Sequence, residues 1–299
     1  MKNGKASILV IAAGCLWGLI GLFTRRMTAA GLDAIQITVL RSLVTAVGLE
    51  ALLLWKDRGK CRIVGKDIWM FMGTGICSIA AFNTLYFITM EQTTLSLAVV
   101  LLYTAPFFVL LLSAVCFGEK LTRQKWKGLL LALIGCICTT GVLHGGLHAT
   151  AVGLLAGIGS GFCYALYSIF GKFALRKYSS ETVTLYTFLV AALALLPLCH
   201  PVQMGQAVFL HAELSVQILL LGVGVTLLPF LLYTKGLSQI DPGKASVLAF
   251  SEPLTATMMG MIAFGEIPDF FGWMGIGLLF AALIVVQMPE KRKNKQSIK

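Results

Sequence analysis

The sequence predicts an all-α polytopic membrane protein with ten transmembrane helices, arranged as two inverted five-helix repeats. Three observations predict this fold. Of the 299 residues, 58% are hydrophobic and 12% are charged, which is too apolar for the surface of a soluble protein. The apolar residues fall in runs of about 20, the length that crosses the ~30 Å hydrocarbon core of a bilayer. The chain also matches itself when it is shifted by 147 residues.

Each apolar run is expected to form a helix, because backbone groups inside lipid must be paired within their own segment. The first run follows Lys2 and Lys5 and so resembles a signal peptide. It is long enough to span the membrane, and we expect it to be a retained first helix. The ten expected spans are 6–24, 34–55, 68–90, 94–117, 128–143, 150–171, 182–199, 214–234, 244–264 and 271–288.

The basic residues orient these spans. There are 24 Lys and Arg against 13 Asp and Glu, a net charge of +11, and the basic residues cluster in alternate loops. Because cytoplasmic loops carry the excess of Lys and Arg, we expect both termini, including a basic tail at 291–299, to be cytoplasmic. Arg25 and Arg26 then fall on the other side, and Arg41 lies within a span. We expect a plasma-membrane protein whose loop charges contact lipid headgroups rather than nucleic acid.

The internal match aligns 81–128 with 228–275 without a gap, and twelve of the 48 positions are identical. Apolar helices share residues by chance, but an in-register proline, Phe-Gly-Glu and tryptophan are harder to explain in that way. These identities are Pro106 with Pro253, Phe117-Gly118-Glu119 with Phe264-Gly265-Glu266, and Trp126 with Trp273.

Each half of the chain holds five expected spans, which is an odd number. The second half, 147–290, therefore enters the membrane from the opposite side to the first half, 1–146. Such inverted repeats are typical of transporters that alternate access around a site near the bilayer midplane.

Several of the same residues carry a family resemblance. The motifs are Gly14-Cys15-Leu16-Trp17-Gly18, Pro106 with the sequence FGEKLT at 117–122, and the second-half counterparts Glu252-Pro253 and Phe264-Gly265-Glu266. With these motifs the chain resembles the drug/metabolite transporter superfamily, and within it proteins with two EamA domains. Tyr164-Ala165 departs from the pattern, because it stands where a repeat of Trp17-Gly18 would fall.

The resemblance implies a central cavity lined by the first, third, fourth, sixth, eighth and ninth spans, with the fifth and tenth peripheral. It also implies that the cargo is a small organic solute and that no ATP is hydrolysed. The glycines spaced four apart, such as Gly14 and Gly18, have a simpler interpretation, since they let helices approach closely.

Charges within a span cost about 2.5–3.5 kcal/mol at the helix centre, so each one is a candidate for function. Glu252 lies inside the ninth span and is followed directly by Pro253, which lacks an N–H and frees the carbonyl one turn earlier. A carboxylate there is suited to binding an ammonium group or a proton, which makes Glu252 a candidate coupling residue. The equally weighted alternative is a structural carboxylate that is satisfied by Ser251, Thr255 or a lysine.

Arg41 lies at a similar depth in the second span, so that Arg41 and Glu252 together are suited to bracketing a zwitterion. The resemblance does not place the second span on the cavity. We therefore favour a structural arginine, bonded to helix-end carbonyls or to a lipid phosphate. A third charge, Glu50, lies close to the basic cluster that begins at Lys56 and is expected to pair there.

Polar and aromatic residues at helical spacing predict the lining of the cavity, because they can hydrogen-bond and stack on a small organic solute. For any one of them, ordinary helix packing is the commoner explanation. The predicted substrate-binding residues are Trp17, Asn83, Tyr86, Tyr103, Tyr164, Ser168, Tyr233 and Glu252, and the predicted gate hinges are Pro106, Pro229 and Pro253. Glu119 and Glu266 follow glycines at helix ends and are expected to bond neighbouring helix termini.

An enzyme is not expected. All four histidines fall in the expected outer loops or at their edges, no Ser–His pair or P-loop is present, and the eight cysteines form no CxxC pair. No metal or cofactor is predicted. We expect a secondary transporter of small polar or amphipathic metabolites such as amino acids, with export favoured by the resemblance and with proton coupling at Glu252. A lipid or glycan-carrier flippase or a passive facilitator is the alternative, and a homodimer is left open.

Overall fold

The structure is a computed structural model that describes residues 2–143, 149–210 and 213–288. The described chain is almost entirely helical and holds nine spans that are long and apolar enough to cross a bilayer. The 17-residue helix α8 (Arg123–Thr139) packs along α16 and is the tenth membrane helix. The predicted all-α fold is therefore confirmed.

Several spans consist of two or three helical segments joined end to end. The first half contains α1 (Lys2–Trp17), α2 (Ile20–Ala29), α3 (Ala34–Lys56), η1 (Arg58–Cys61), η2 (Gly65–Asp67), α4 (Ile68–Met72), η3 (Gly73–Ala80), α5 (Ala81–Gln92), α6 (Leu95–Leu102), α7 (Ala105–Phe117) and α8. The second half contains α9 (Ala151–Ala174), α10 (Ser180–Leu195), η4 (Leu196–Leu198), α11 (Pro201–Leu210), α12 (Glu213–Leu219), η5 (Leu220–Leu227), α13 (Leu228–Leu237), α14 (Pro242–Leu248), α15 (Ser251–Phe264) and α16 (Phe270–Gln287).

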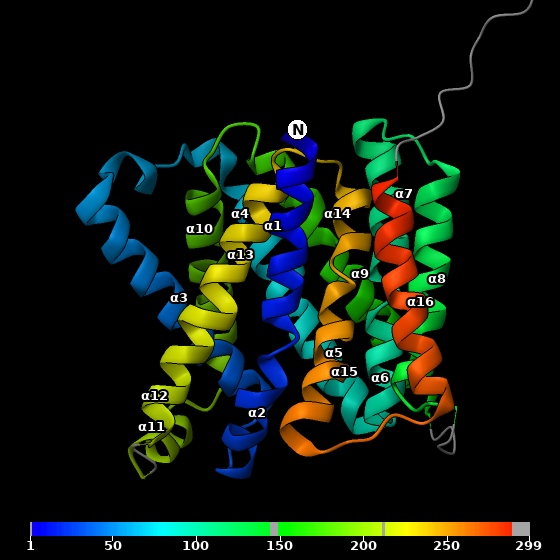
Figure 1. Cartoon of the computed structure of the whole chain (residues 1–299). Helices are drawn as coiled ribbons and strands as arrows, with labels where there is room; N and C mark the ends of the chain where they lie inside the picture. The colour runs from blue at the N-terminus through cyan, green and yellow to red at the C-terminus, as the bar shows by residue number, and fades with distance from the viewer. Residues whose placement is uncertain (1, 144–148, 211–212, 289–299) are drawn as a thin grey trace, which may run out of the picture.

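The start of α1 and the end of α16 lie at the same end of the bundle (Figure 1). The connections from α7 to α8, from α9 to α10 and from α13 to α14 lie at this end as well. We call it the terminal side of the protein and the opposite end the far side. The basic clusters predicted this grouping of termini and loops.

The repeated Phe-Gly-Glu motif ends a helix in each half. Gly118 and Gly265 follow the last residues of α7 and α15, with φ angles of 65° and 67°. Only glycine takes this left-handed conformation without steric cost, and it closes the last helical turn. The motif is therefore first of all a helix terminator.

Backbone features recur at the 147-residue spacing even where the two sequences do not match. The π-helical stretches η3 and η5 begin at Gly73 and Leu220 and end at Ala80 and Leu227, and both pairs of positions are 147 apart. Helical breaks also recur, between α6 and α7 and between α14 and α15. The first span is interrupted at Gly18–Leu19, whereas its counterpart α9 is continuous.

The two halves interlock through their first and third spans. α1 packs along α13, and in the matching arrangement α9 packs along α5. The small residues Gly236 and Gly153 allow both approaches, because a methyl group at either one would press on the opposite backbone. α8 and α16 form a separate pair at one edge of the bundle (Figure 1), which leaves the other spans around the centre.

Candidate functional site

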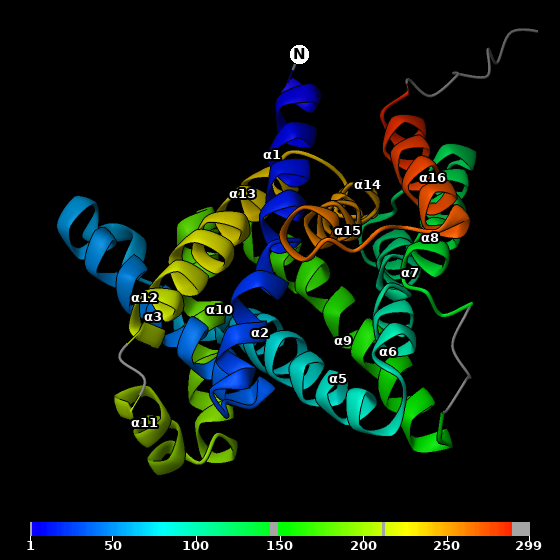
Figure 2. The same cartoon turned by 60° about the horizontal axis from the view of Figure 1, so that its bottom comes forward.

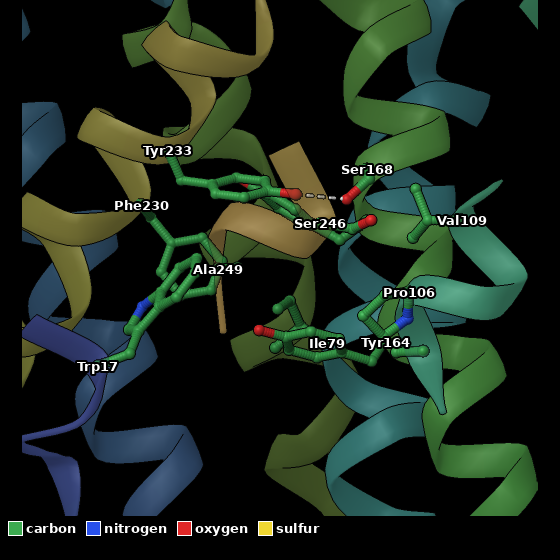
Figure 3. Close-up of a pocket in the computed structure, with 12 residues that line it drawn as sticks. Trp17, Ile79, Pro106, Val109, Tyr164, Ser168, Phe230, Tyr233, Ser246 and Ala249 are labelled. Carbon is green, nitrogen blue, oxygen red and sulfur yellow. Dashed lines mark hydrogen bonds between the residues drawn. The ribbon is translucent and has the colours of Figure 1, made fainter. Parts of the chain in front are cut away.

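A pocket lies between the two halves, and side chains from six spans line it (Figure 3). These are the first, third, fourth, sixth, eighth and ninth spans, the set that the resemblance implied. The pocket has a volume of about 30 Å³, room for roughly two water molecules, so it must widen to hold an organic solute. The lining residues are Trp17, Ile79, Ala105, Pro106, Val109, Tyr164, Tyr167, Ser168, Phe230, Tyr233, Ser246 and Ala249.

Aromatic rings form one wall of the pocket. Trp17 packs edge-on against Phe230 with ring centroids 4.9 Å apart, and it also contacts Tyr233 at 5.3 Å. The hydroxyl groups of Tyr233 and Ser168 share a 2.7 Å hydrogen bond across the pocket (Figure 3). The wall therefore offers an apolar face and a pair of hydroxyl groups, a combination suited to an amphipathic solute.

Arg41 in α3 is buried and reaches α5. Its Nη2 donates to Asn83 Oδ1 at 3.3 Å, and Thr38 Oγ1 donates to the same oxygen at 3.1 Å. The amide nitrogen of Asn83 donates to the carbonyl of Ile79, which lines the pocket. Arg41 is thus held by a side chain one helical turn from the pocket. We expected helix-end carbonyls or a lipid phosphate as its partners, and the lipid phosphate stays a prediction.

Glu252 lies in the first turn of α15, three residues after the pocket residue Ala249. Its carboxyl group interacts electrostatically with Arg41, Tyr86, Tyr103 and Tyr164. Among the described residues no ion pair joins Glu252 to a basic group. Two opposite charges therefore flank the tyrosines next to the pocket without touching each other.

The immediate surroundings of Glu252 differ in two ways from those predicted. Ser251 Oγ donates to the carbonyl of Ile11 in α1, so this hydroxyl does not serve the carboxylate. The backbone N–H of Glu252 donates to the carbonyl of Ala249, the group that Pro253 was expected to leave free. The carboxylate is therefore free of the structural role that Ser251 was expected to give it.

The predicted binding residues divide into two groups. Trp17, Tyr164, Ser168 and Tyr233 line the pocket itself. Asn83, Tyr86, Tyr103 and Glu252 lie beside it, joined by ring contacts and charge interactions: Phe82 contacts both Tyr86 and Tyr164, and Tyr103 packs on Phe250.

The predicted hinge prolines lie at segment starts. Pro106 and Pro229 stand at the beginning of α7 and α13, and Pro253 is the third residue of α15. The positions of Pro106 and Pro253 suit proline, because the first turn of a helix needs no N–H donor. Pro229 lies where η5 continues directly into α13. The prolines therefore mark where segments join, and their role in movement stays a prediction.

Tyr167 and Phe230 line the pocket, yet they were not predicted. Tyr167 lies three residues after Tyr164, and Phe230 lies three residues before Tyr233, so each shares a helical face with a predicted residue. Helical spacing extended by one turn in each direction would have found both.

Of the repeated acids, Glu119 bonds a neighbouring helix terminus, as expected. Glu119 Oε2 accepts from the backbone N–H of Gly243 at 3.1 Å, and its other oxygen pairs with Lys125 at 2.7 Å. Lys125 also lies 3.4 Å from Asp241. Glu266, its counterpart on the far side, is exposed.

The fold and its pocket define a multi-pass membrane protein of the transporter class, with two interlocked inverted halves around a central cavity. The profile of the EamA-like transporter family matches residues 4–141 and 151–288. The chain belongs to this family, and the resemblance to the drug/metabolite transporter superfamily is confirmed.

Three further comparisons agree. An uncharacterized transporter of Archaeoglobus fulgidus is 28% identical and covers 95% of this chain and 96% of its own length. The aromatic amino acid exporter YddG of Ancylobacter novellus is 23% identical, over 88% of this chain and 90% of its own. A crystal structure with 19% identity superposes with a TM-score of 0.79, covering 95% and 96% of the two chains, which shows the shared fold.

Proposed function

We propose that the protein is a secondary carrier of small amphipathic zwitterions, amino acids above all, and that it works by alternating access of its two halves. The observation that supports this is the placement of Arg41 and Glu252 next to one aromatic pocket. An α-amino acid carries a carboxylate and an ammonium group, and these match the charges of Arg41 and Glu252. The aromatic wall is suited to an apolar side chain.

The direction of transport and the membrane orientation belong to the same proposal. The cytoplasm faces the terminal side, since the basic loops gather there, and transport runs outward. The family membership and the exporter named among the relatives support this direction. A green fluorescent protein fused to the C-terminus would fluoresce in this orientation, whereas a non-fluorescent fusion in the membrane fraction would contradict it.

The charge assignment is tested with three probes in proteoliposomes: L-phenylalanine, phenethylamine, which lacks the carboxylate, and 3-phenylpropionate, which lacks the ammonium group. We expect the wild-type protein to prefer L-phenylalanine by about tenfold or more, since a lost charged hydrogen bond costs about 1.5–3 kcal/mol. Arg41→Gln should remove the discrimination against phenethylamine, and Glu252→Gln that against 3-phenylpropionate.

Glu50→Gln serves as the control, because Glu50 is a charged residue of α3 that is exposed. It should keep the wild-type order of the three probes. Discrimination that is unchanged in both Arg41→Gln and Glu252→Gln would contradict the charge assignment. Absence of saturable flux of any probe, together with stabilisation by lipids or polyprenyl phosphates alone, would favour a flippase.

Proton coupling at Glu252 is a separate part of the proposal. Coupled transport of L-phenylalanine should depend on an imposed pH gradient in the wild-type protein and lose this dependence in Glu252→Gln. If the variant keeps the full response to the gradient, Glu252 is not the coupling residue.

A further inference from the structure

On the terminal side, two side chains bind the turn between α13 and α14. Lys172 Nζ, near the end of α9, donates to the carbonyl oxygens of Leu237 at 2.6 Å and Ile240 at 2.8 Å. Glu119, beyond the end of α7, accepts from Gly243 in the same turn. Both contacts are stabilising, because they give hydrogen-bond partners to backbone groups at helix ends that have none within the helix. They tie α9 and α7, which pack on each other, to the end of α13 and the start of α14.

The internal repeat carries this set of residues onto the far side. A shift of 147 places Arg25 at the position of Lys172 and Glu266 at that of Glu119. It also places Met90, Thr93 and Ser96 at the positions of Leu237, Ile240 and Gly243. The surrounding sequences agree as well, since Phe23 stands two residues before Arg25 and Phe170 two before Lys172.

The far-side residues are not engaged in the matching way. Arg25 and Glu266 are both exposed. The Arg25 guanidinium lies 4.4 Å from the ring centroid of Phe264, the last residue of α15. Arg25 therefore lies near the end of α15, which is two residues before Glu266. α2 packs on α3, α12 and η5, while α15 packs on α1, α8 and α16. Figure 2, in which the far side comes forward, shows α2, α15, α6 and α5 around the middle of this side.

We propose that Arg25 and Glu266 close the far side when the terminal side opens. Arg25 then donates to the carbonyl oxygens of Met90 and Thr93, at the end of α5, and Glu266 accepts from the backbone N–H of Ser96. Lys172 and Glu119 release the α13–α14 turn in the same transition. The inference rests on the alternating access that is proposed above and assigns the residues that hold each of its two closed ends.

The chemistry of the four residues fits this exchange. Lysine and arginine both donate to several carbonyl oxygens, which carry partial negative charge at a helix C-terminus, and the guanidinium offers more donors for two acceptors. The proposal also explains why Arg25 is basic, although the side on which it lies carries few Lys and Arg residues. The closures differ in one respect, because Lys125 corresponds to Gly272 and the far side has no counterpart of the Lys125 ion pairs.

Hydrogen exchange measured by mass spectrometry tests the proposal in the native chain, without any substrate. In the wild-type protein, exchange should be slow in 237–248 and faster in 21–29 and 90–97. Lys172→Gln should speed exchange on the terminal side and slow it in both far-side segments, by about tenfold where a charged hydrogen bond is exchanged. Glu119→Gln releases the same turn and serves as a second route if Lys172→Gln does not fold.

The decisive comparison adds a second change to Lys172→Gln. Arg25→Gln should abolish the far-side protection, whereas Arg26→Gln, the neighbouring exposed basic residue, should leave it in place. Equal far-side protection in the two double variants would overturn the assignment of Arg25. Terminal-side opening without any far-side protection in Lys172→Gln would instead contradict alternating access itself, so the two failures are distinguishable.

Discussion

Gly18 lies directly against the backbone of Glu252. A Cβ atom at Gly18 would lie 2.7 Å from the Glu252 carbonyl oxygen and 2.9 Å from the backbone nitrogen of Ala256. One turn earlier, a Cβ atom at Gly14 would overlap Ser251 Oγ. The first span therefore supports the start of α15 through two glycines, and the position of the carboxylate depends on this contact.

Gly18→Ala should disturb the Glu252 region and destabilise the protein by about 1–3 kcal/mol, the range for overpacking a close contact. Two of the three nearest atoms are backbone and the third is Thr255 Cβ, which is attached directly to the backbone, so none can move aside as the end of a flexible side chain would. Thermal unfolding in detergent measures the effect. Gly21→Ala is the matched control, because nothing lies within 4 Å of its added methyl group, and an equal loss of stability in both variants would contradict the explanation.

Tyr233→Phe removes the hydroxyl that bonds Ser168 in the pocket. The loss should be about 0.5–1.5 kcal/mol of stability, the usual net value of a hydrogen bond. Ser168→Ala should cost a similar amount, and the double variant should cost less than the sum of the two. Chemical unfolding of the four proteins measures this coupling, and strictly additive losses would mean that the two hydroxyls act independently.

Pro106→Ala and Pro253→Ala test the predicted hinges. Both prolines follow two-residue breaks in their spans, at 103–104 and 249–250. Alanine restores a backbone donor and allows the two segments to fuse into one helix. We expect slower transport with little change in unfolding temperature. Unchanged transport rates in both variants would exclude the prolines as hinges.

Glu119 should make stability depend on pH. Burial raises the pKa of Glu119 above its ordinary value, although Lys125 and the backbone of Gly243 bond to it. The folded state then holds this proton more tightly than the unfolded chain. Its contribution to stability is complete below the unfolded pKa of about 4.3 and is lost as pH rises through the folded value.

The measurement compares unfolding temperatures of the wild-type protein and Glu119→Gln from acidic to neutral pH. The wild-type protein should lose stability relative to the variant as pH rises through this window. Parallel curves would show that the Glu119 carboxyl does not titrate with folding.

The membrane spans and the grouping of basic loops at one end of the bundle were predictable. The length of an apolar run is set by the thickness of the bilayer, and basic loops gather on one side of it. The repeat was predictable as well, since Pro106 and Pro253 and the two Phe-Gly-Glu motifs keep their register. Trp17, Tyr164, Ser168 and Tyr233 line the pocket because they share helical faces with small residues. Helical spacing indicated these four residues, and the family resemblance indicated which spans face the cavity.

The bond between Arg41 and Asn83 was beyond prediction, since it joins two spans whose relative rotation depends on the whole bundle. The π-helical stretches carry no distinctive residues in Gly73–Ala80 or Leu220–Leu227. Lys172 carried a signal that was missed, because the repeat was aligned from 81 onward and its match to Arg25 lies before that point. Extending the alignment toward the N-terminus would have shown it.

The break at Gly18–Leu19 makes the pseudo-symmetry incomplete in a mechanical sense. The first span of one half consists of two helical segments, α1 and α2, whereas the first span of the other half is α9, a continuous helix of 24 residues. The two membrane faces therefore cannot open along mirror-image paths. Under the alternating access proposed above, the outward and inward steps should therefore differ in rate even in a vesicle with equal solutions on both sides.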